Sequence, residues 1–144
     1  MTRDLSERLR AVVDSLPLHE GMRVLEIGCG PGAAAREVAR RVGDGHVHAI
    51  DRSPHAIAQA VAGSEAEIAS GRLTFQRVAA EDFILPAGES RFDLAFAVRV
   101  GALDGRRPEA GRRALARIAA VLTPAGRLLV GDGGSMTVIG LPGR

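Results

Sequence analysis

The chain of 144 residues is long enough for one domain with a single hydrophobic core, and it leaves little room for a second domain. Its formal net charge is only +2, so bulk charge gives no reason to expect nucleic acid as a partner. The single cysteine, Cys29, excludes an intrachain disulfide. Arginine is present without lysine, and asparagine is absent, a bias typical of GC-rich, bacterial-type coding sequences.

No apolar run reaches the roughly 20 residues that a bilayer-spanning helix needs. Residues 1–10 are rich in charge and lack the apolar centre of a secretion signal. We therefore expect a cytoplasmic protein without a membrane partner.

The first predicted element is an amphipathic helix over residues 4–16. Its apolar residues recur every three or four positions, which is the spacing of one helix face, and Pro17 closes it. The pattern predicts strands at 23–27, 46–50, 73–78, 92–98 and 127–130, and a short strand at 136–139. Between them it predicts helices at 33–42, at 54–62 with Ser53 as the N-cap and an extension at 64–70, and at 108–122. A loop is predicted at 86–91 and a turn at 123–126. This alternation predicts an α/β fold, a doubly wound and mainly parallel sheet with helices on both faces.

A glycine-rich loop joins the first predicted strand to the next helix. Gly28, Gly30 and Gly32 let a ligand lie against bare backbone, and the N–H groups at the start of the helix favour an anionic group there. The loop lacks the lysine of a P-loop, whereas Gly28, Gly30 and Ala33 satisfy the G-x-G-x-x-G/A pattern of nicotinamide-binding folds. A tight turn without a ligand also fits, so the loop alone does not decide the class of site.

Two acidic residues narrow the choice between these classes of ligand site. Glu26 lies in the first predicted strand, and a buried carboxylate costs several kcal/mol unless it has a partner. A cationic ligand group could be that partner, whereas a nicotinamide site gains nothing obvious from an acid there. Asp51 ends the second predicted strand, where a carboxylate can accept hydrogen bonds from both hydroxyls of a ribose. Capping of the next helix is the alternative role for Asp51, although Ser53 fills that role better.

Four segments around these acids carry a family resemblance. Residues 24–32 (VLEIGCGPG) place an acid in an apolar strand before G-x-G-x-G, and residues 49–53 (AIDRS) place an acid at the end of the second strand. Residues 92–98 (FDLAFAV) form an apolar fourth strand, and residues 122–130 (LTPAGRLLV) are similar to an L-x-P-G-G-x-L segment with Ala125 in place of a glycine. In this order, over about residues 21–132, they resemble the motifs of class I S-adenosylmethionine-dependent methyltransferases.

The resemblance implies a Rossmann-like sheet of strand order 3-2-1-4-5 with a reduced or absent C-terminal hairpin. It also implies one methyltransferase-like domain over residues 1–144, with an N-terminal helix in 1–20, a cofactor-binding core in 21–132 and a short tail in 133–144. The implied activity is methyl transfer from S-adenosyl-L-methionine to an O, N or C nucleophile of a small molecule. The implied cofactor-binding residues are Glu26, Gly28, Cys29, Gly30, Gly32 and Asp51, with Arg52 beside the adenine, the backbone of Ala80 plus either Glu81 or Asp82 at the adenine amino group, and Val98 near the methionine ammonium.

Three departures from the family pattern limit what it predicts. Ala79 stands where members often carry an adenine-binding Asp, and a solvated loop position is the alternative for the two acids that follow it. No histidine base follows the fourth strand. Arg99 and Asp104 are the candidates for binding or deprotonating the substrate, with a surface salt bridge as the favoured alternative. A missing C-terminal hairpin would expose a sheet edge, which a homodimer could cover.

Other clusters are set aside on the sequence. His46 and His48 share one strand face, but no third ligand is evident, so we expect no metal site. Cys29 is explained as a small residue of the loop motif rather than as a reactive thiol. Five arginines lie in or beside the helix predicted at 108–122, and we expect them to form a solvated basic face, with RNA binding as the less favoured alternative. They are Arg106, Arg107, Arg112, Arg113 and Arg117.

Two rival functions stay open. A nicotinamide-dependent oxidoreductase predicts retention of NAD and no binding of S-adenosylhomocysteine, and Glu26 and the lack of tyrosine count against it. A non-catalytic S-adenosylmethionine-binding module, or a subunit active only with a partner, predicts cofactor binding without turnover. The lack of an evident base favours this second rival.

Overall fold

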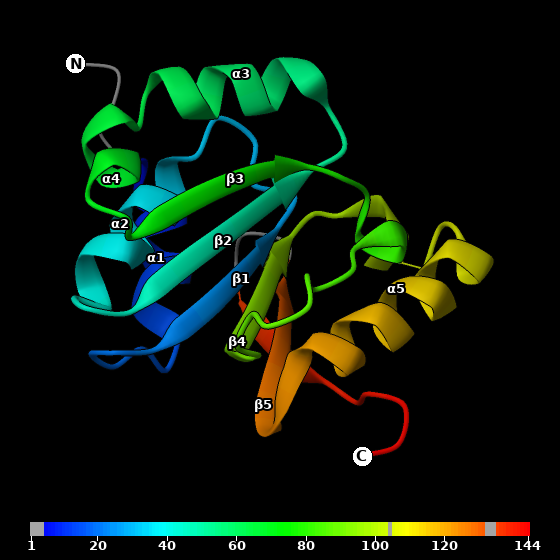
Figure 1. Ribbon diagram of the computed structural model, residues 1–144. Helices are drawn as coiled ribbons and strands as arrows, with labels where there is room; N and C mark the ends of the chain where they lie inside the picture. Colours follow the sequence, from blue (N-terminus) through cyan, green and yellow to red (C-terminus); the bar gives the residue numbers. More distant parts are fainter. Residues whose placement is uncertain (1–4, 104, 132–134) are drawn as a thin grey trace.

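Six strands form one sheet in the computed structural model, which describes residues 5–103, 105–131 and 135–144 (Figure 1). The strands are β1 (Arg23–Ile27), β2 (His46–Asp51), β3 (Leu73–Arg77), β4 (Phe92–Val98), β5 (Leu122–Gly131) and β6 (Met136–Ile139). Their order across the sheet is β3-β2-β1-β4-β5-β6, parallel except for β6, which runs antiparallel to β5. The predicted order 3-2-1-4-5 is confirmed, and β6 adds the C-terminal hairpin in its reduced form.

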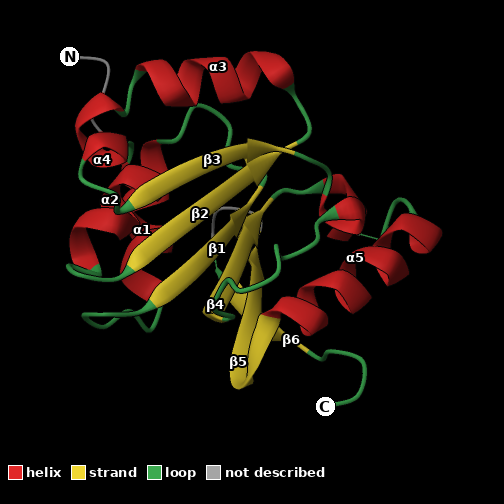
Figure 2. Ribbon diagram, in the orientation of Figure 1, coloured by secondary structure: helices red, strands yellow, loops and turns green. Residues whose placement is uncertain are grey.

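Helices cover both faces of the sheet (Figure 2). They are α1 (Glu7–Ser15), α2 (Ala33–Arg41), α3 (Pro54–Ala62), α4 (Glu65–Ala69) and α5 (Pro108–Val121), with single 3-10 turns η1 (Ala80–Asp82) and η2 (Gly101–Leu103). One core lies under α1 and α2 and includes Val13 and Val38, and a second lies under α5 and η1 and includes Phe83 and Ile118. The central strand β1 contributes to both cores, because successive side chains of a strand point to opposite faces. Among these helices none is both long and apolar enough to cross a bilayer.

The N-terminal helix begins three residues later than the periodicity predicts, at Glu7. Its N-cap is Ser6, whose Oγ accepts a hydrogen bond of 3.2 Å from the backbone N–H of Leu9. A side-chain oxygen that satisfies one of the first helical N–H groups fixes where a helix starts, and apolar spacing carries no such information. The prediction for Ser53 is confirmed in the same way, because its Oγ accepts the N–H of Ala56 at the start of α3.

The predicted turn at residues 123–126 is wrong as a boundary, because β5 runs through it from Leu122. Leu122 pairs with Phe92 of β4, and the next pair is Arg127 with Leu94, so five steps along β5 match two steps along β4. The Pro-Ala-Gly segment is therefore an excursion within the strand rather than the turn before it. Proline and glycine predict a local bend in the chain. The pairing of β5 with β4 on both sides of that bend is a long-range contact, which these residue types do not predict.

The strand β6 changes the expected edge of the sheet. Its four residues pair with residues 128–131 of β5, from Leu128 opposite Ile139 to Gly131 opposite Met136. The edge of β5 that we expected a second copy to cover is thus paired within the chain, so it gives no reason to expect a homodimer there. A short edge strand such as β6 is one of the ways in which proteins limit edge-to-edge association.

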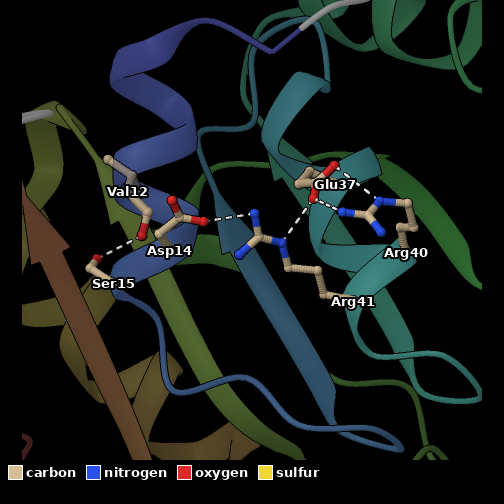
Figure 3. Close-up of polar contacts among 6 residues, drawn as sticks. All are labelled: Val12, Asp14, Ser15, Glu37, Arg40 and Arg41. Carbon is tan, nitrogen blue, oxygen red and sulfur yellow. Dashed lines mark hydrogen bonds and ion pairs between the residues drawn. The ribbon is translucent and has the colours of Figure 1, made fainter.

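A polar network joins α1 to α2 (Figure 3). Arg41 of α2 contacts Asp14 of α1, with Nη2 and Oδ1 2.7 Å apart, and its Nε lies 2.8 Å from Oε2 of Glu37. Glu37 also pairs with Arg40, and these two arginines hold the pKa of the Glu37 carboxyl below its usual value. Each such surface pair contributes at most about 1 kcal/mol. Together they attach α1 to the helix that begins at the glycine loop.

Candidate functional site

The glycine loop lies where β1 ends and α2 begins, at the carboxyl edge of the parallel strands. The backbone N–H groups of Gly28 and Cys29 both donate to the carbonyl of Ile50, over 2.8 and 3.0 Å, which pins the loop to the end of β2. Gly30 has a φ of +54°, and a Cβ built there meets nothing within 4 Å. The loop therefore presents bare backbone to an open space at Gly30, which is the geometry that close approach of a ligand requires.

Gly32 has a different role within the same loop. Its φ is +90°, it is the N-cap of α2, and a Cβ there would lie 3.1 Å from Phe75 and 3.2 Å from Ala60. This glycine lets the start of α2 pack against β3 and α3 rather than facing a ligand.

Asp51, the last residue of β2, is held in place by the glycine loop. Its Oδ2 accepts the N–H of Gly30 at 2.9 Å, and its Oδ1 accepts the N–H of Ser53 at 2.9 Å. A carboxylate has about four lone-pair positions, so each oxygen keeps one for a further donor. The carboxylate is thus oriented in advance to accept two more hydrogen bonds, which matches the predicted ribose contact.

Glu26, in the middle of the sheet, is buried and only 5% exposed. Its Oε1 has no hydrogen-bond partner among the residues that the structure describes. Burial first, and the charge of Asp51 second, raise the pKa of this carboxyl from 4.5 to about 8. A carboxyl in that state is neutral at neutral pH and has room to pair with a cation or a hydrogen-bond donor.

Two adjoining cavities meet over the loop. The first, of about 220 Å³, lies beside the ends of β2 and β3, and its lining includes Asp51, Arg52 and Glu81. The second, of about 350 Å³, lies between the loop and α1, and its lining includes Glu26 and Gly30. The residues common to both linings are Gly28, Val98 and Arg99. A ligand that spans both cavities would therefore reach Asp51 at one end and Glu26 at the other.

The structure brings most of the predicted binding residues to these cavities. Those that line one cavity or both are Glu26, Gly28, Cys29, Gly30, Asp51, Arg52, Ala80, Glu81, Val98 and Arg99. Gly32 does not line them, for the packing reason given above. Asp82 turns away, since its Oδ1 lies 3.1 Å from Nη2 of Arg113 on α5. Asp104 lies outside the described residues.

Arg99 follows β4 with a φ of +57°, an uncommon value for a residue with a side chain. Its N–H donates to the carbonyl of Gly131 over 2.9 Å, so the end of β5 fixes this conformation. Cys29 also lines the second cavity, but burial raises the pKa of its thiol, which opposes the reactive thiolate. We therefore assign neither Arg99 nor Cys29 as a general base.

Sequence reasoning missed the contribution of α1 and of Val100. Ser6, Arg8 and Leu9 close the second cavity from the side of α1. Val100 lines the first cavity, and a Cβ on Gly28 would lie only 2.6 Å from its Cγ2. Both features are contacts between distant parts of the chain, and no local motif marks them.

Comparison with known proteins gives consistent findings. A family described as "Methyltransferase domain" matches residues 24–126. O-methyltransferase rstn1 of Aspergillus nomiae is 35% identical over 133 residues, which are 92% of this chain and 52% of that protein. The chain spans about half the length of the curated relatives it matches.

Solved structures agree in fold. The structure of the cyclase SpnF is 32% identical, with a TM-score of 0.67 over 85% of this chain and 42% of that chain. A SAM-dependent methyltransferase from Thiobacillus denitrificans, in complex with S-adenosyl-L-homocysteine, is 25% identical, with a TM-score of 0.67 over 90% of this chain and 49% of that chain.

Proposed function

The chain belongs to the class I S-adenosylmethionine-dependent methyltransferase family, and from that membership we propose that it binds S-adenosyl-L-methionine across the two cavities and transfers the methyl group to an oxygen of a small molecule. The observation that carries the proposal is Glu26, a buried carboxyl with an unpartnered oxygen in the second cavity. Family membership and this acid both count against the nicotinamide-dependent oxidoreductase that the glycine pattern alone left open.

The residues present fit this cofactor. Asp51 is oriented to accept hydrogen bonds from two ribose hydroxyls. Gly30 leaves open space where the nucleoside crosses the loop, since a Cβ there meets nothing within 4 Å. Glu26 offers a negative charge to a cationic methionine group, at the far end of the same cleft. The acids therefore lie at opposite ends of one site, one suited to neutral hydroxyl donors and one to a cation.

When bound, the cofactor supplies a methyl group that its sulfonium already activates for transfer. The contribution of the chain is to bind and orient. Asp51 and Arg52 hold the nucleoside end, and Glu26 holds the amino-acid end and gives up its proton when a cation pairs with it. Ser6, the N-cap of α1, and Leu9 close the second cavity from the side of that helix. Alignment of nucleophile and methyl carbon can account for much of a rate enhancement, so the lack of a histidine base is compatible with catalysis.

Two findings support an oxygen acceptor on a small molecule. The curated relatives that cover 92% of this chain are named O-methyltransferases. The second cavity, about 350 Å³ in all, would hold the methionine end of the cofactor and a small acceptor beside the loop.

Two observations favour a second candidate, a cofactor-binding domain whose chemistry is not methyl transfer. The chain is 32% identical to the structure of a cyclase. In the described lining of the two cavities there is also no histidine to act as a base.

Calorimetry followed by a turnover assay separates these candidates. We expect S-adenosylhomocysteine to bind at one site per chain and NAD to give no heat above that of dilution. Transfer of a tritiated methyl group from the cofactor to a panel of phenols and alcohols then supports the methyltransferase. Cofactor binding without transfer to any of them supports the second candidate, and NAD binding in place of S-adenosylhomocysteine overturns both.

A further inference from the structure

Two histidines lie side by side on a part of the sheet that no helix covers. His46 and His48 point to the same face of β2, and Thr74 and Gln76 point to that face from the neighbouring strand β3. Figure 2 shows α5 over β4 and β5 and no helix over this face of β2 and β3. Both histidines are half-buried, and neither lines the two cavities at the glycine loop.

Hydrogen bonds assign the proton on each imidazole when Gln76 presents its amide oxygen to His48. Nδ1 of His46 lies 2.8 Å from the carbonyl of Gly71, and a carbonyl only accepts, so Nδ1 carries the proton and Nε2 carries the lone pair. Nε2 of His48 lies 2.9 Å from Oε1 of Gln76, which likewise only accepts, so Nδ1 of His48 carries the lone pair.

Both lone pairs converge on one atom. Nε2 of His46 lies 2.9 Å from Oγ1 of Thr74, and Nδ1 of His48 lies 2.6 Å from the same oxygen. A threonine hydroxyl has a single proton to donate, so one of the two imidazole lone pairs is left without a donor.

We propose that Nε2 of His46 and Nδ1 of His48 bind one divalent late transition-metal ion, Cu²⁺ most tightly, which takes the place of the Thr74 hydroxyl between the two rings, with water completing the coordination. Neutral imidazole suits such ions, and Cu²⁺ binds nitrogen and oxygen ligands more tightly than its neighbours in the series. Sequence reasoning set this pair aside for want of a third protein ligand. Water oxygens take that place here.

The surroundings of the pair resemble those of metal-binding histidines in general. Such histidines donate their second ring N–H to a carbonyl or carboxylate, which fixes the tautomer, and Gly71 and Gln76 do this here. Stacking fixes the plane of the His48 ring, whose centroid lies 5.6 Å from that of Phe83.

The charges around the pair nearly balance. Arg23 and Glu89 act on both imidazoles with opposite sign. The guanidinium of Arg23 is engaged, since its Nη2 donates to the carbonyl of Ser90 over 3.2 Å and it lies over the ring of Phe92. A bound cation thus meets one positive and one negative side chain.

One arrangement competes with the metal site. If the amide of Gln76 presents its N–H₂ to His48, a neutral ladder runs from Gln76 through His48, Thr74 and His46 to Gly71, and every lone pair has a donor. In that arrangement the proton of His48 is on Nδ1, so the two arrangements differ in an observable tautomer.

The test uses the full chain freed of metal with a chelator and then titrated with CuCl₂ by calorimetry. We expect one Cu²⁺ per chain, and at least tenfold weaker binding in both His46→Gln and His48→Gln. Gln76→Met removes the acceptor that fixes His48 and should weaken binding roughly 10–100-fold. The matched control is His55→Gln, an exposed histidine on α3, which should bind as the wild type does.

Two results overturn the proposal. One is Cu²⁺ binding by the wild type that is no tighter than that of the His46→Gln and His48→Gln variants. The other comes from nitrogen-15 NMR of the imidazoles in the metal-free wild type, which needs no variant to fold. A proton on Nδ1 of His48 identifies the neutral ladder and excludes the chelating pair, whereas a proton on Nε2 supports it.

Discussion

Replacement of Glu26 by glutamine should change how the stability of the folded chain depends on pH. The folded-state pKa of this carboxyl, about 8, lies above its value of 4.5 in the unfolded chain. Between these pH values the Glu26 carboxyl is ionised in the unfolded chain and protonated in the folded chain. Its contribution to the free energy of unfolding is therefore fully present below pH 4.5 and is lost as the pH rises to 8. The slope is about 1.4 kcal/mol per pH unit, and the whole loss is about 5 kcal/mol.

The assay is urea unfolding at pH 5, 6, 7 and 8. We expect the free energy of unfolding of Glu26→Gln to fall less steeply with pH than that of the wild type, by roughly one kcal/mol per unit. The comparison of slopes avoids the offset that a buried, unpaired amide adds at every pH. Glu65→Gln removes an exposed carboxyl on α4 and should keep the wild-type slope. Parallel slopes in the wild type and Glu26→Gln would refute the reasoning that Glu26 is held neutral by burial.

Three further predictions concern the cleft and the C-terminus. Asp51→Ala should weaken S-adenosylhomocysteine binding by roughly 1–3 kcal/mol in calorimetry through loss of hydrogen bonds to a charged group, and unchanged affinity contradicts the ribose assignment. Gly30→Ala places a methyl group in the cleft at φ +54°, so it should lower both affinity and melting temperature, whereas Gly21→Ala, at φ +85° with equal open space, should lower the melting temperature alone. Arg144→Ala removes hydrogen bonds from the guanidinium to four carbonyls, two of them those of Ala119 and Leu122 at the end of α5, and should lower the free energy of unfolding by about 1 kcal/mol. An unchanged urea midpoint in Arg144→Ala would mean that water replaces these bonds.

The main elements were predictable because they depend on local periodicity, and the strand order followed from the family resemblance. The apolar run at 23–27 specifies a strand that is buried on both faces, and the alternation at 46–50 specifies one that is buried mainly on one face. The glycine loop was predictable for a similar reason, since a short segment carries its whole geometry. Glycine permits the positive φ that the structure has at Gly28 and Gly30.

Contacts between distant segments were not predictable. The role of Asp51 in fixing the loop depends on a bond to the N–H of Gly30, and the convergence of His46 and His48 depends on the register of β2 against β3. Asp82 illustrates the same limit, because its partner Arg113 lies on α5 and draws it away from the cleft. A single sequence gives residue types and spacing, and such contacts require the folded chain.

The most direct test of the account is a crystal structure of the full chain with S-adenosylhomocysteine. We predict one molecule across both cavities, with its ribose hydroxyls within hydrogen-bond distance of Asp51 and its ammonium in the cavity of Glu26. A molecule bound elsewhere, an empty cleft at saturating ligand, or a dinucleotide retained in the cleft would contradict the account.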